Sequence, residues 1–154
     1  MDNFETAVGW NDGAVAEVRD RLVDFNLERT GLEESQPRSV VHRDHNDRID
    51  AGIVSYIWGG VLTIDWLWVD TPLRGNGIGT RMLGDAEEWA IARDCHMAYL
   101  TTYAFQSPAF YLNGGYHLVM DLPDAPVGHS LLVFVKPLGP AVRLSGAEGA
   151  PVRL

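Results

Sequence analysis

The sequence predicts a domain of the α/β (α+β) class, and three observations lead to this prediction. The chain has 154 residues, 46% hydrophobic and 21% charged, which suits one globular domain with a substantial core. Apolar, β-branched and aromatic runs at residues 51–58 and 61–69 flank Gly59-Gly60, a pattern typical of a β-hairpin. Residues 78–92 then show helical periodicity between two strand-like segments, which predicts a crossover unit rather than a second hairpin.

The first third of the chain is expected to contain a strand, a helix and a polar loop. Residues 4–10 suit a short strand. A helix is predicted over residues 13–29, where Asn11 or Asp12 can cap its start and Gly31 ends it. Its apolar residues recur with the three-to-four spacing of a single helix face: Val15, Val18, Leu22, Phe25 and Leu27.

Shorter elements complete the domain. Strands are predicted at residues 39–43, 97–102, 116–122 and 131–135, with a polar turn at 45–50. A short helix is expected at residues 107–113, entered through Pro108 and ended by Gly114-Gly115. We therefore expect one domain over residues 1–138. The Gly-, Pro- and Ala-rich tail at 139–154 is either flexible or ordered by docking on the domain or on a neighbouring subunit.

The hairpin's second run alternates between two sets of side chains. One face is expected to carry Leu62, Ile64, Trp66 and Trp68, and the other Thr63, Asp65, Leu67 and Val69. Asp65 is the anomaly, a carboxylate midway along an otherwise apolar strand. Partial burial would raise its pKa and suit it to act as a general base through water. Alternatively, Asp65 bonds a neighbouring backbone group or arginine.

A glycine-rich turn precedes the long helix of residues 78–92. Glycines at positions 75, 77 and 79 leave out side chains where the backbone bends tightly or approaches a ligand. The first acid of the helix is Asp85, whereas Arg74 and Arg81 flank its start. Because the free N–H groups and dipole at a helix start favour negative charge, this pattern predicts a site for a bound anion.

The helix that follows is amphipathic. Its apolar stripe consists of Ile78, Met82, Leu83, Ala86, Trp89 and Ala90. Glu87 and Glu88 are expected to face solvent. The turn before it does not fit two known phosphate-binding patterns. A P-loop needs Lys and Ser/Thr after its last glycine, and a dinucleotide-binding turn needs glycine or alanine where Thr80 stands.

Composition excludes several classes of function. The net charge of −9 argues against nucleic-acid binding, and no apolar run approaches the roughly 18 residues of a membrane span. The N-terminus lacks a signal-peptide pattern, and the single cysteine, Cys95, suits a reducing cytoplasm. The five histidines show no metal-ligand spacing, so we expect no metal. The oligomeric state, a homodimer included, stays open.

The glycine turn resembles the signature of a known family. Arg74-Gly75-Asn76-Gly77-Ile78-Gly79 matches the Arg/Gln-x-x-Gly-x-Gly/Ala pattern of the GNAT superfamily of N-acetyltransferases. Upstream, LWVDTPLRG is similar to the family's strand and short loop. Downstream, MAYLTT is similar to its next strand, and FYLNGGY to its Phe-Tyr-x-x-x-Gly-Phe/Tyr element. The FQSPAFY segment is similar to a subgroup of bacterial members.

The resemblance implies a fold and a reaction. The fold is a mixed, mostly antiparallel sheet of six to seven strands, splayed around a cofactor cleft and flanked by about four helices. The reaction is direct attack of a small-molecule or peptide amine on acetyl-CoA, without a metal. Tyr111 matches the tyrosine that gives a proton to the departing thiolate, although it could also serve only to pack the short helix onto the sheet.

The resemblance also implies which residues bind the acetyl donor. Backbone amides of residues 75–80 would hold the CoA pyrophosphate, and residues 67–69 would pair with the pantetheine arm. The implied cofactor-binding set is Leu67, Trp68, Val69, Arg74, Gly75, Asn76, Gly77, Ile78, Gly79, Thr80, Gln106 and Phe110. The family often places Asn at the position of Ala104, and Gln106 is the nearby substitute here.

The acceptor side is less defined. Candidates are Phe25, Asn26, Trp58 and Trp66, the tryptophans serving either core packing or an aromatic wall for a cationic amine. Three hypotheses follow. The chain is an acetyl-CoA-dependent N-acetyltransferase or a non-catalytic acyl-CoA-binding sensor of the same fold, while a phosphate or nucleotide binder is disfavoured by the turn's residues.

Overall fold

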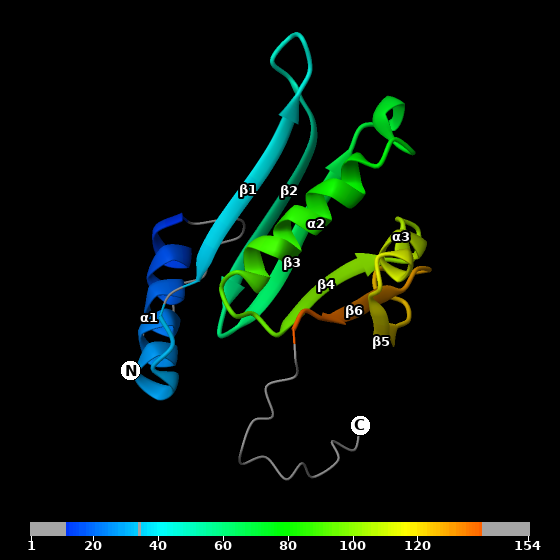
Figure 1. Ribbon diagram of the computed structural model, residues 1–154. Coiled ribbons are helices and arrows are strands. Elements are labelled where there is room, and N and C mark those ends of the chain that lie inside the picture. Colours follow the sequence, from blue (N-terminus) through cyan, green and yellow to red (C-terminus); the bar gives the residue numbers. More distant parts are fainter. Residues whose placement is uncertain (1–11, 34, 140–154) are drawn as a thin grey trace. The chain divides into compact units, whose positions relative to one another are not determined.

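The computed structural model describes residues 12–33 and 35–139 (Figure 1). The strand expected at residues 4–10 and the tail beyond residue 139 lie outside this part of the chain. The chain divides into two compact units, Met1–Ser35 and Gln36–Leu154. The extent of a single domain over residues 1–138 stays a prediction.

The first unit contains helix α1 (Asp12–Thr30), which confirms the helix predicted there. Gly31 ends it as expected, because its φ of 68° is a left-handed conformation that glycine adopts without strain. Its N–H donates to the carbonyl of Leu27 at 2.8 Å and so satisfies one of the last helical acceptors.

The second unit is built on a six-stranded sheet in the order β1-β2-β3-β4-β6-β5. The strands are β1 (Gln36–Arg43), β2 (Ile49–Trp58), β3 (Val61–Val69), β4 (Met97–Tyr103), β5 (His117–Leu122) and β6 (Leu131–Pro137). Strands β3 and β4 pair in parallel, and the other neighbours pair antiparallel. The expected mixed, mostly antiparallel sheet is therefore confirmed.

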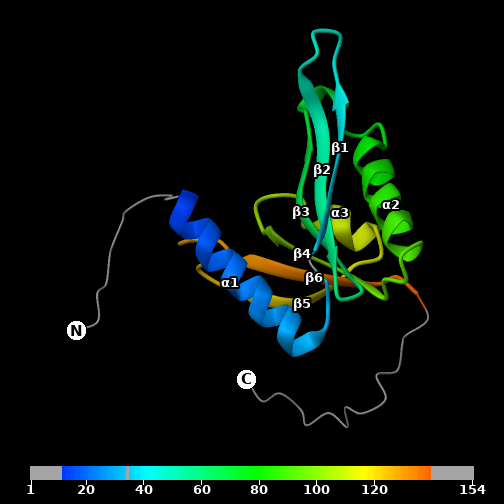
Figure 2. The ribbon, with the colours of Figure 1, turned by 90° about the vertical axis from the view of Figure 1, so that its left-hand side faces the viewer.

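The helices are slightly fewer than expected. The described residues form α1, α2 (Ile78–Ile91), α3 (Pro108–Asn113) and the 3-10 turn η1 (Thr71–Leu73). Both ribbon views place α2 along one face of β2 and β3 (Figures 1 and 2). Its buried residues are Met82, Leu83, Ala86 and Ala90, with Ile78 and Trp89 packed beside them, so the predicted stripe is confirmed.

The predicted β-hairpin formed by β2 and β3 is confirmed at its turn. Gly59 and Gly60 both have positive φ, 59° and 76°, and Trp58 pairs with Val61 across them. Positive φ at both central residues gives the turn twist that matches the twist of paired strands. The polar turn before β2 is shorter than expected, because Ile49 already belongs to the strand.

The predicted alternation along β3 is wrong beyond Ile64. Val54 pairs with Trp66 whereas Ser55 pairs with Ile64, so Asp65 is the extra residue of a β-bulge. One inserted residue moves all later side chains to the opposite face. Trp66 and Trp68 are consequently 70% and 55% exposed. The side chains packed on the core there are instead Leu67 and Val69.

Glu87 also departs from its expected position at the surface, whereas Glu88 is exposed as predicted. The Glu87 side chain is only 13% exposed and pairs with Lys136 of β6 at 2.6 Å. Its second oxygen, Oε1, is buried without a hydrogen-bond partner, as is the hydroxyl of Tyr116. Burial, and then the Glu87 carboxylate, raise the pKa of Tyr116 far above its usual 10. The Glu87–Lys136 ion pair therefore holds α2 to strand β6.

Candidate functional site

Strands β3 and β4 part midway along their length. Their parallel pairing runs from Val61 with Met97 to Ile64 with Leu100, after which β3 continues to Val69 and β4 to Tyr103. Figure 1 shows β4 turning away from β3 beyond the paired region. We call this place the β3–β4 split. The bulge in the β2–β3 pairing falls at Asp65, which is the first residue of β3 beyond the last β3–β4 pair.

The glycine turn lies at the start of α2, which packs along β3. Gly75 and Gly77 both have a φ of 77°, and Gly77 is the N-cap residue of α2. A Cβ at either position would meet no atom within 4 Å, so glycine is required there for its backbone conformation. No side chain caps the helix, and no acidic residue lies in its first turn. The helix start therefore offers uncapped N–H groups to an anion.

Gly79 and Phe110 pack closely together. A Cβ on Gly79 would lie 3.5 Å from the ring of Phe110 and 3.6 Å from Cγ2 of Val69. Phe110 is half-buried on α3, so the absence of a side chain at Gly79 lets α3 approach the first turn of α2. The structure thus brings Val69, Gly79 and Phe110 together, three members of the cofactor-binding set expected from the sequence. Ile78 is half-buried beside them and Thr80 is exposed.

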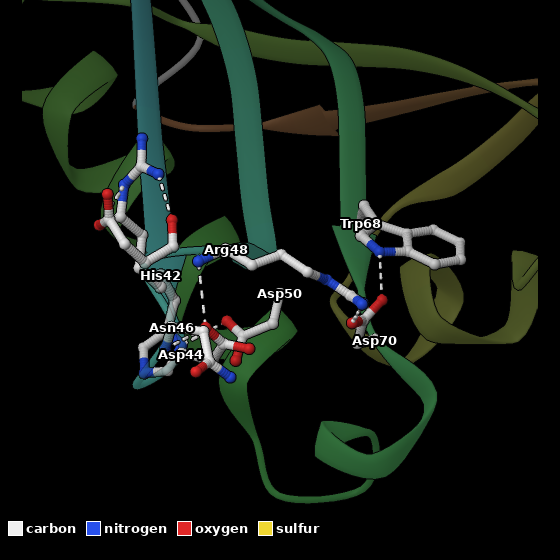
Figure 3. Close-up of polar contacts among 9 residues, drawn as sticks. His42, Asp44, Asn46, Arg48, Asp50, Trp68 and Asp70 are labelled. Atoms are coloured by element: carbon white, nitrogen blue, oxygen red, sulfur yellow. Dashed lines mark hydrogen bonds and ion pairs between the residues drawn. The ribbon is translucent and has the colours of Figure 1, made fainter.

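Arg74 leaves the turn toward the end of β3. Its Nε donates to the carbonyl of Val69 at 2.9 Å, and its guanidinium lies 5.1 Å from the centre of the Trp68 ring. Trp68 Nε1 in turn donates to Asp70 at 2.9 Å, and Asp70 also pairs with Arg48 (Figure 3). Asn76 donates to the carbonyl of Leu73 at 3.3 Å. These contacts fix the turn against the neighbouring strands before any ligand arrives.

A second polar contact supports the same end of the sheet. His42 Nδ1 and Asp50 Oδ1 lie 2.5 Å apart, and Asp50 is 8% exposed (Figure 3). The carbonyl of Asp50 accepts from the N–H of Asp70 at 2.8 Å. The carboxylate of Asp44 accepts from the N–H groups of Asn46 and Arg48, which closes the β1–β2 turn. No local sequence pattern predicts this cluster, because it joins the β1–β2 hairpin to Asp70, just after β3.

Tyr111 is half-buried on α3. Its ring makes edge contacts with Phe110 at 5.1 Å and Tyr116 at 5.9 Å, and it lies 6.1 Å from Phe134. Among the described residues, no side chain or backbone group hydrogen-bonds to its hydroxyl. Burial raises the pKa of the Tyr111 phenol above its usual 10, so the group keeps its proton well beyond neutral pH. A held ring with a free, protonated hydroxyl can donate a proton.

Asp65 lies at the split with its side chain exposed. No described residue hydrogen-bonds to or pairs with its carboxylate, so the alternative partner considered from the sequence, a backbone group or arginine, is not found. Neighbouring protein still removes part of the carboxylate's hydration, which raises the pKa of Asp65 from its usual 3.8. The group is therefore an unpaired carboxylate in a position to accept a proton.

Gln106 is fixed by the end of β4. Its Oε1 accepts hydrogen bonds from the Thr102 hydroxyl at 2.8 Å and from the N–H of Tyr103 at 2.9 Å. This arrangement uses the side-chain carbonyl and leaves the amide –NH₂ as a donor. Contact with a pantetheine arm stays a prediction.

The expected acceptor residues come from both units, and Trp58 and Trp66 belong to the same one. Trp58 lies at the Gly59-Gly60 turn, and Trp66 lies about 16 Å farther along β3 at about 3.3 Å per residue. The two therefore do not form one aromatic wall. Phe25 and Asn26 belong to α1 in the other unit, where Arg29 lies over the Phe25 ring and the Asn26 carbonyl accepts from the Thr30 hydroxyl.

Sequence reasoning did not predict that three aromatic residues come together near the end of β4. Tyr103 and Phe105 stack with their ring centres 5.2 Å apart, and His129 makes an edge contact with Phe105 at 4.8 Å. The alternate positions of Tyr103 and Phe105 offered a weak signal. Nothing in the sequence connected them with His129, which comes from the β5–β6 loop.

The described residues contain no group of three or more His, Cys, Asp or Glu side chains that could hold a metal ion. Within the same residues, no helix is long and apolar enough to cross a membrane. The candidate site consists of the uncapped start of α2, the β3–β4 split, the phenol of Tyr111 and the carboxylate of Asp65.

Comparison with known proteins agrees with this geometry. Residues 3–116 match the model of the acetyltransferase (GNAT) family. The chain is 35% identical to blasticidin-S acetyltransferase of Streptomyces morookaense over 118 residues, covering 73% of this chain and 85% of that protein. It is 30% identical to an acetyltransferase of Agrobacterium fabrum over 114 residues, covering 74% and 83%.

A solved structure from Agrobacterium tumefaciens, assigned to the acetyltransferases, superposes with a TM-score of 0.82. It is 28% identical and covers 88% of this chain and 99% of its own. The family model spans the parted strands, the glycine turn and Tyr111 alike. The chain belongs to the GNAT family of acetyltransferases.

Proposed function

We propose that the protein transfers an acetyl group from acetyl-CoA to a primary amine of a small molecule or peptide. The uncapped start of α2, beside the β3–β4 split, is the observation that carries this proposal. CoA is an elongated anion, and its pyrophosphate suits the N–H groups of residues 75–80. Residues 67–69 have backbone groups on the side of the split where an extended pantetheine arm could add as a strand.

The residues of the split supply the proton chemistry of the proposed reaction. The acceptor nitrogen attacks the thioester carbonyl, a C–N bond forms and the C–S bond breaks. Asp65 takes the proton from the amine through a water molecule, and Tyr111 gives its proton to the departing thiolate. Both raised pKa values support these roles, since a phenol that stays protonated can donate and a more basic carboxylate accepts better.

Similarity to blasticidin-S acetyltransferase supports a small-molecule acceptor. The single cysteine, Cys95, is buried and free, which is consistent with the cytoplasmic location that we propose for the reaction. Neither observation identifies the amine, so the test must begin with a panel.

The test measures thiol release from acetyl-CoA in the presence of blasticidin S, spermidine and a lysine-containing peptide, each against a blank without amine. We expect amine-dependent thiol release with at least one acceptor, together with an acetylated product 42 Da heavier, the mass that one acetyl group adds in place of a hydrogen. Binding of acetyl-CoA without release across a broad amine panel would contradict the proposal and favour the acyl-CoA-binding sensor. Absence of acetyl-CoA binding would overturn both.

A further inference from the structure

Three side chains connect the β1–β2 hairpin with the arginine of the glycine turn. Asp70 Oδ2 pairs with Arg48, and Asp70 Oδ1 accepts a hydrogen bond from Trp68 Nε1 at 2.9 Å (Figure 3). The centre of the Trp68 ring lies 5.1 Å from the guanidinium carbon of Arg74. We call Arg48, Asp70 and Trp68 the arginine support. The proposed reaction gives no role to the side chain of any of the three.

Arg74 is held in place while most of its hydrogen-bond donors stay unused. Its Nε donates to the Val69 carbonyl at 2.9 Å, and one face of the guanidinium lies over the Trp68 ring. Within residues 12–33 and 35–139, no group hydrogen-bonds to or pairs with its two terminal amino groups. The N–H donors of these amino groups can together bind two oxygens of one phosphate. Arg74 is therefore ordered before a ligand binds and can still take an anion.

Asp70 is the acid that could neutralise Arg74. It is the acid nearest to Arg74 in the sequence, and only the 3-10 turn η1 separates the two. Its carboxylate pairs instead with Arg48 and Trp68, and its N–H donates to the Asp50 carbonyl at 2.8 Å. Because each carboxylate oxygen already has a partner and the backbone of Asp70 is bonded to β2, the positive charge of Arg74 stays available to a ligand.

The contacts of the arginine support are too exposed to contribute much to folding. The side chain of Arg48 is 69% exposed, and Trp68 is 55% exposed because the bulge at Asp65 turns it away from the core. Water and salt screen exposed ion pairs, and an exposed cation–π contact is weak. An arginine that is already ordered, however, loses less conformational freedom when it binds a ligand. The support therefore favours binding at the glycine turn more than it favours folding.

We propose that Arg48, Asp70 and Trp68 are positioning residues that hold Arg74 at the glycine turn for contact with a phosphate of CoA. This inference rests on the proposed function, in which acetyl-CoA binds at residues 75–80. Trp68 acts on Arg74 through its ring, whereas Asp70 and Arg48 act through Trp68. Their side chains move no proton, so changes in the support should alter the affinity for CoA and leave kcat unchanged.

The first test is a double-mutant cycle that measures the dissociation constant of CoA by calorimetry, without turnover. Arg74→Gln is expected to weaken CoA binding about tenfold, because hydrogen bonds from a charged donor are lost. Trp68→Leu is expected to weaken it about threefold, in the range of an exposed cation–π contact. The double variant should bind CoA like Arg74→Gln alone, because Trp68 acts through Arg74. Independent effects would multiply to about thirtyfold in the double variant and would overturn the proposal.

The second test examines the hairpin end of the support. Arg48→Gln is expected to weaken CoA binding about twofold, as befits an exposed ion pair, and to shift the indole N–H resonance of Trp68 in NMR spectra. Arg43→Gln is the matched control, since it removes the same charge from the same hairpin but Arg43 pairs with Asp47. We expect it to change neither the CoA affinity nor the Trp68 resonance. Equal effects of the two substitutions would remove Arg48 from the support.

Failure of the support and failure of the proposed function are distinguishable. If CoA binds and the cycle shows coupling between Trp68 and Arg74 but no amine supports thiol release, the acetyl transfer fails and the support stands. If amines are acetylated but Trp68→Leu weakens CoA binding equally with and without Arg74, the acetyltransferase stands and the support is wrong. A wild-type protein that does not bind CoA would overturn both. Thermal unfolding of every variant separates lost binding from lost folding.

Discussion

The two sides of the β3–β4 split have opposite chemical character. On the side of β3, the glycine turn lies between Arg74 and Arg81, and the first turn of α2 lacks acids. On the side of β4, no lysine or arginine occurs between Arg93 and Lys136, and aromatic rings are exposed. A chain with a net charge of −9 thus keeps positive charge where an anion would bind and has none along this part of the β4 side.

The two sides also differ in what forms the site. The glycine turn presents backbone N–H groups, made accessible by glycine, whereas the β4 side presents the aromatic side chains of Tyr103, Phe105 and His129. Tyr111 and Asp65 belong to neither surface, and the proposed reaction uses them as its proton donor and acceptor. We therefore expect that donor and acceptor recognition can be changed independently.

The largest effect is expected at Tyr111, which serves neither recognition surface. Tyr111→Phe should lower kcat about a thousandfold, within the range for a lost general acid, because the thiolate would leave without its proton. The acetyl-CoA and acceptor KM values should stay within about twofold. Tyr116→Phe is the control, since it makes the same change in an adjacent ring whose hydroxyl has no partner. Equal activity of wild type and Tyr111→Phe would remove Tyr111 from the mechanism.

A smaller effect is expected at Asp65, with a characteristic dependence on pH. The base must be deprotonated, and its pKa is raised, so activity should fall as pH drops through a value above the usual 3.8. Asp65→Asn should lower kcat/KM about a hundredfold and abolish this acid limb. The raised pKa of Tyr111 places the loss of its proton above pH 10, outside the same window. If the Asp65→Asn variant still loses activity as the pH falls, a group other than Asp65 is the base.

The smallest of these effects is expected at Gly77, which belongs only to the proposed acetyl-CoA site. Gly77→Ala places a Cβ in a left-handed conformation, which costs about 1–2 kcal/mol and is expected to raise the acetyl-CoA KM about tenfold. The acceptor KM should not change. Gly84→Ala is the control in the same helix, where nothing crowds the new methyl group and alanine should stabilise the helix by about 0.5–1 kcal/mol. A Gly77 variant with normal acetyl-CoA kinetics would show that the turn is not the donor site.

Local sequence patterns predicted the parts of the fold that depend on neighbouring residues. Gly59-Gly60, the α2 stripe and the end of α1 at Gly31 all follow from turn geometry or helical periodicity, and the structure confirms them. The bulge at Asp65 could not be predicted this way, because it depends on how β3 pairs with β2, and it reverses the positions of Trp66 and Trp68.

The candidate site, too, could be predicted only where its residues are close together in the sequence. The glycine turn was predicted because its requirements lie within a few consecutive residues. Glu87 was misplaced because its partner, Lys136, comes from β6 at the other end of the unit. The cluster of Tyr103, Phe105 and His129 was missed for a similar reason, since His129 approaches Phe105 through the β5–β6 loop.

Acetyl-CoA is proposed to bind at the glycine turn and to leave the β4 side of the split free for the acceptor. The most direct test follows backbone amide resonances of the ¹⁵N-labelled protein during titration with acetyl-CoA. We predict saturable shifts that are largest at residues 75–80 and extend to residues 67–69, with those of Phe105 and His129 little changed. Shifts centred on Phe105 and His129, or no shifts at millimolar acetyl-CoA, would contradict the account.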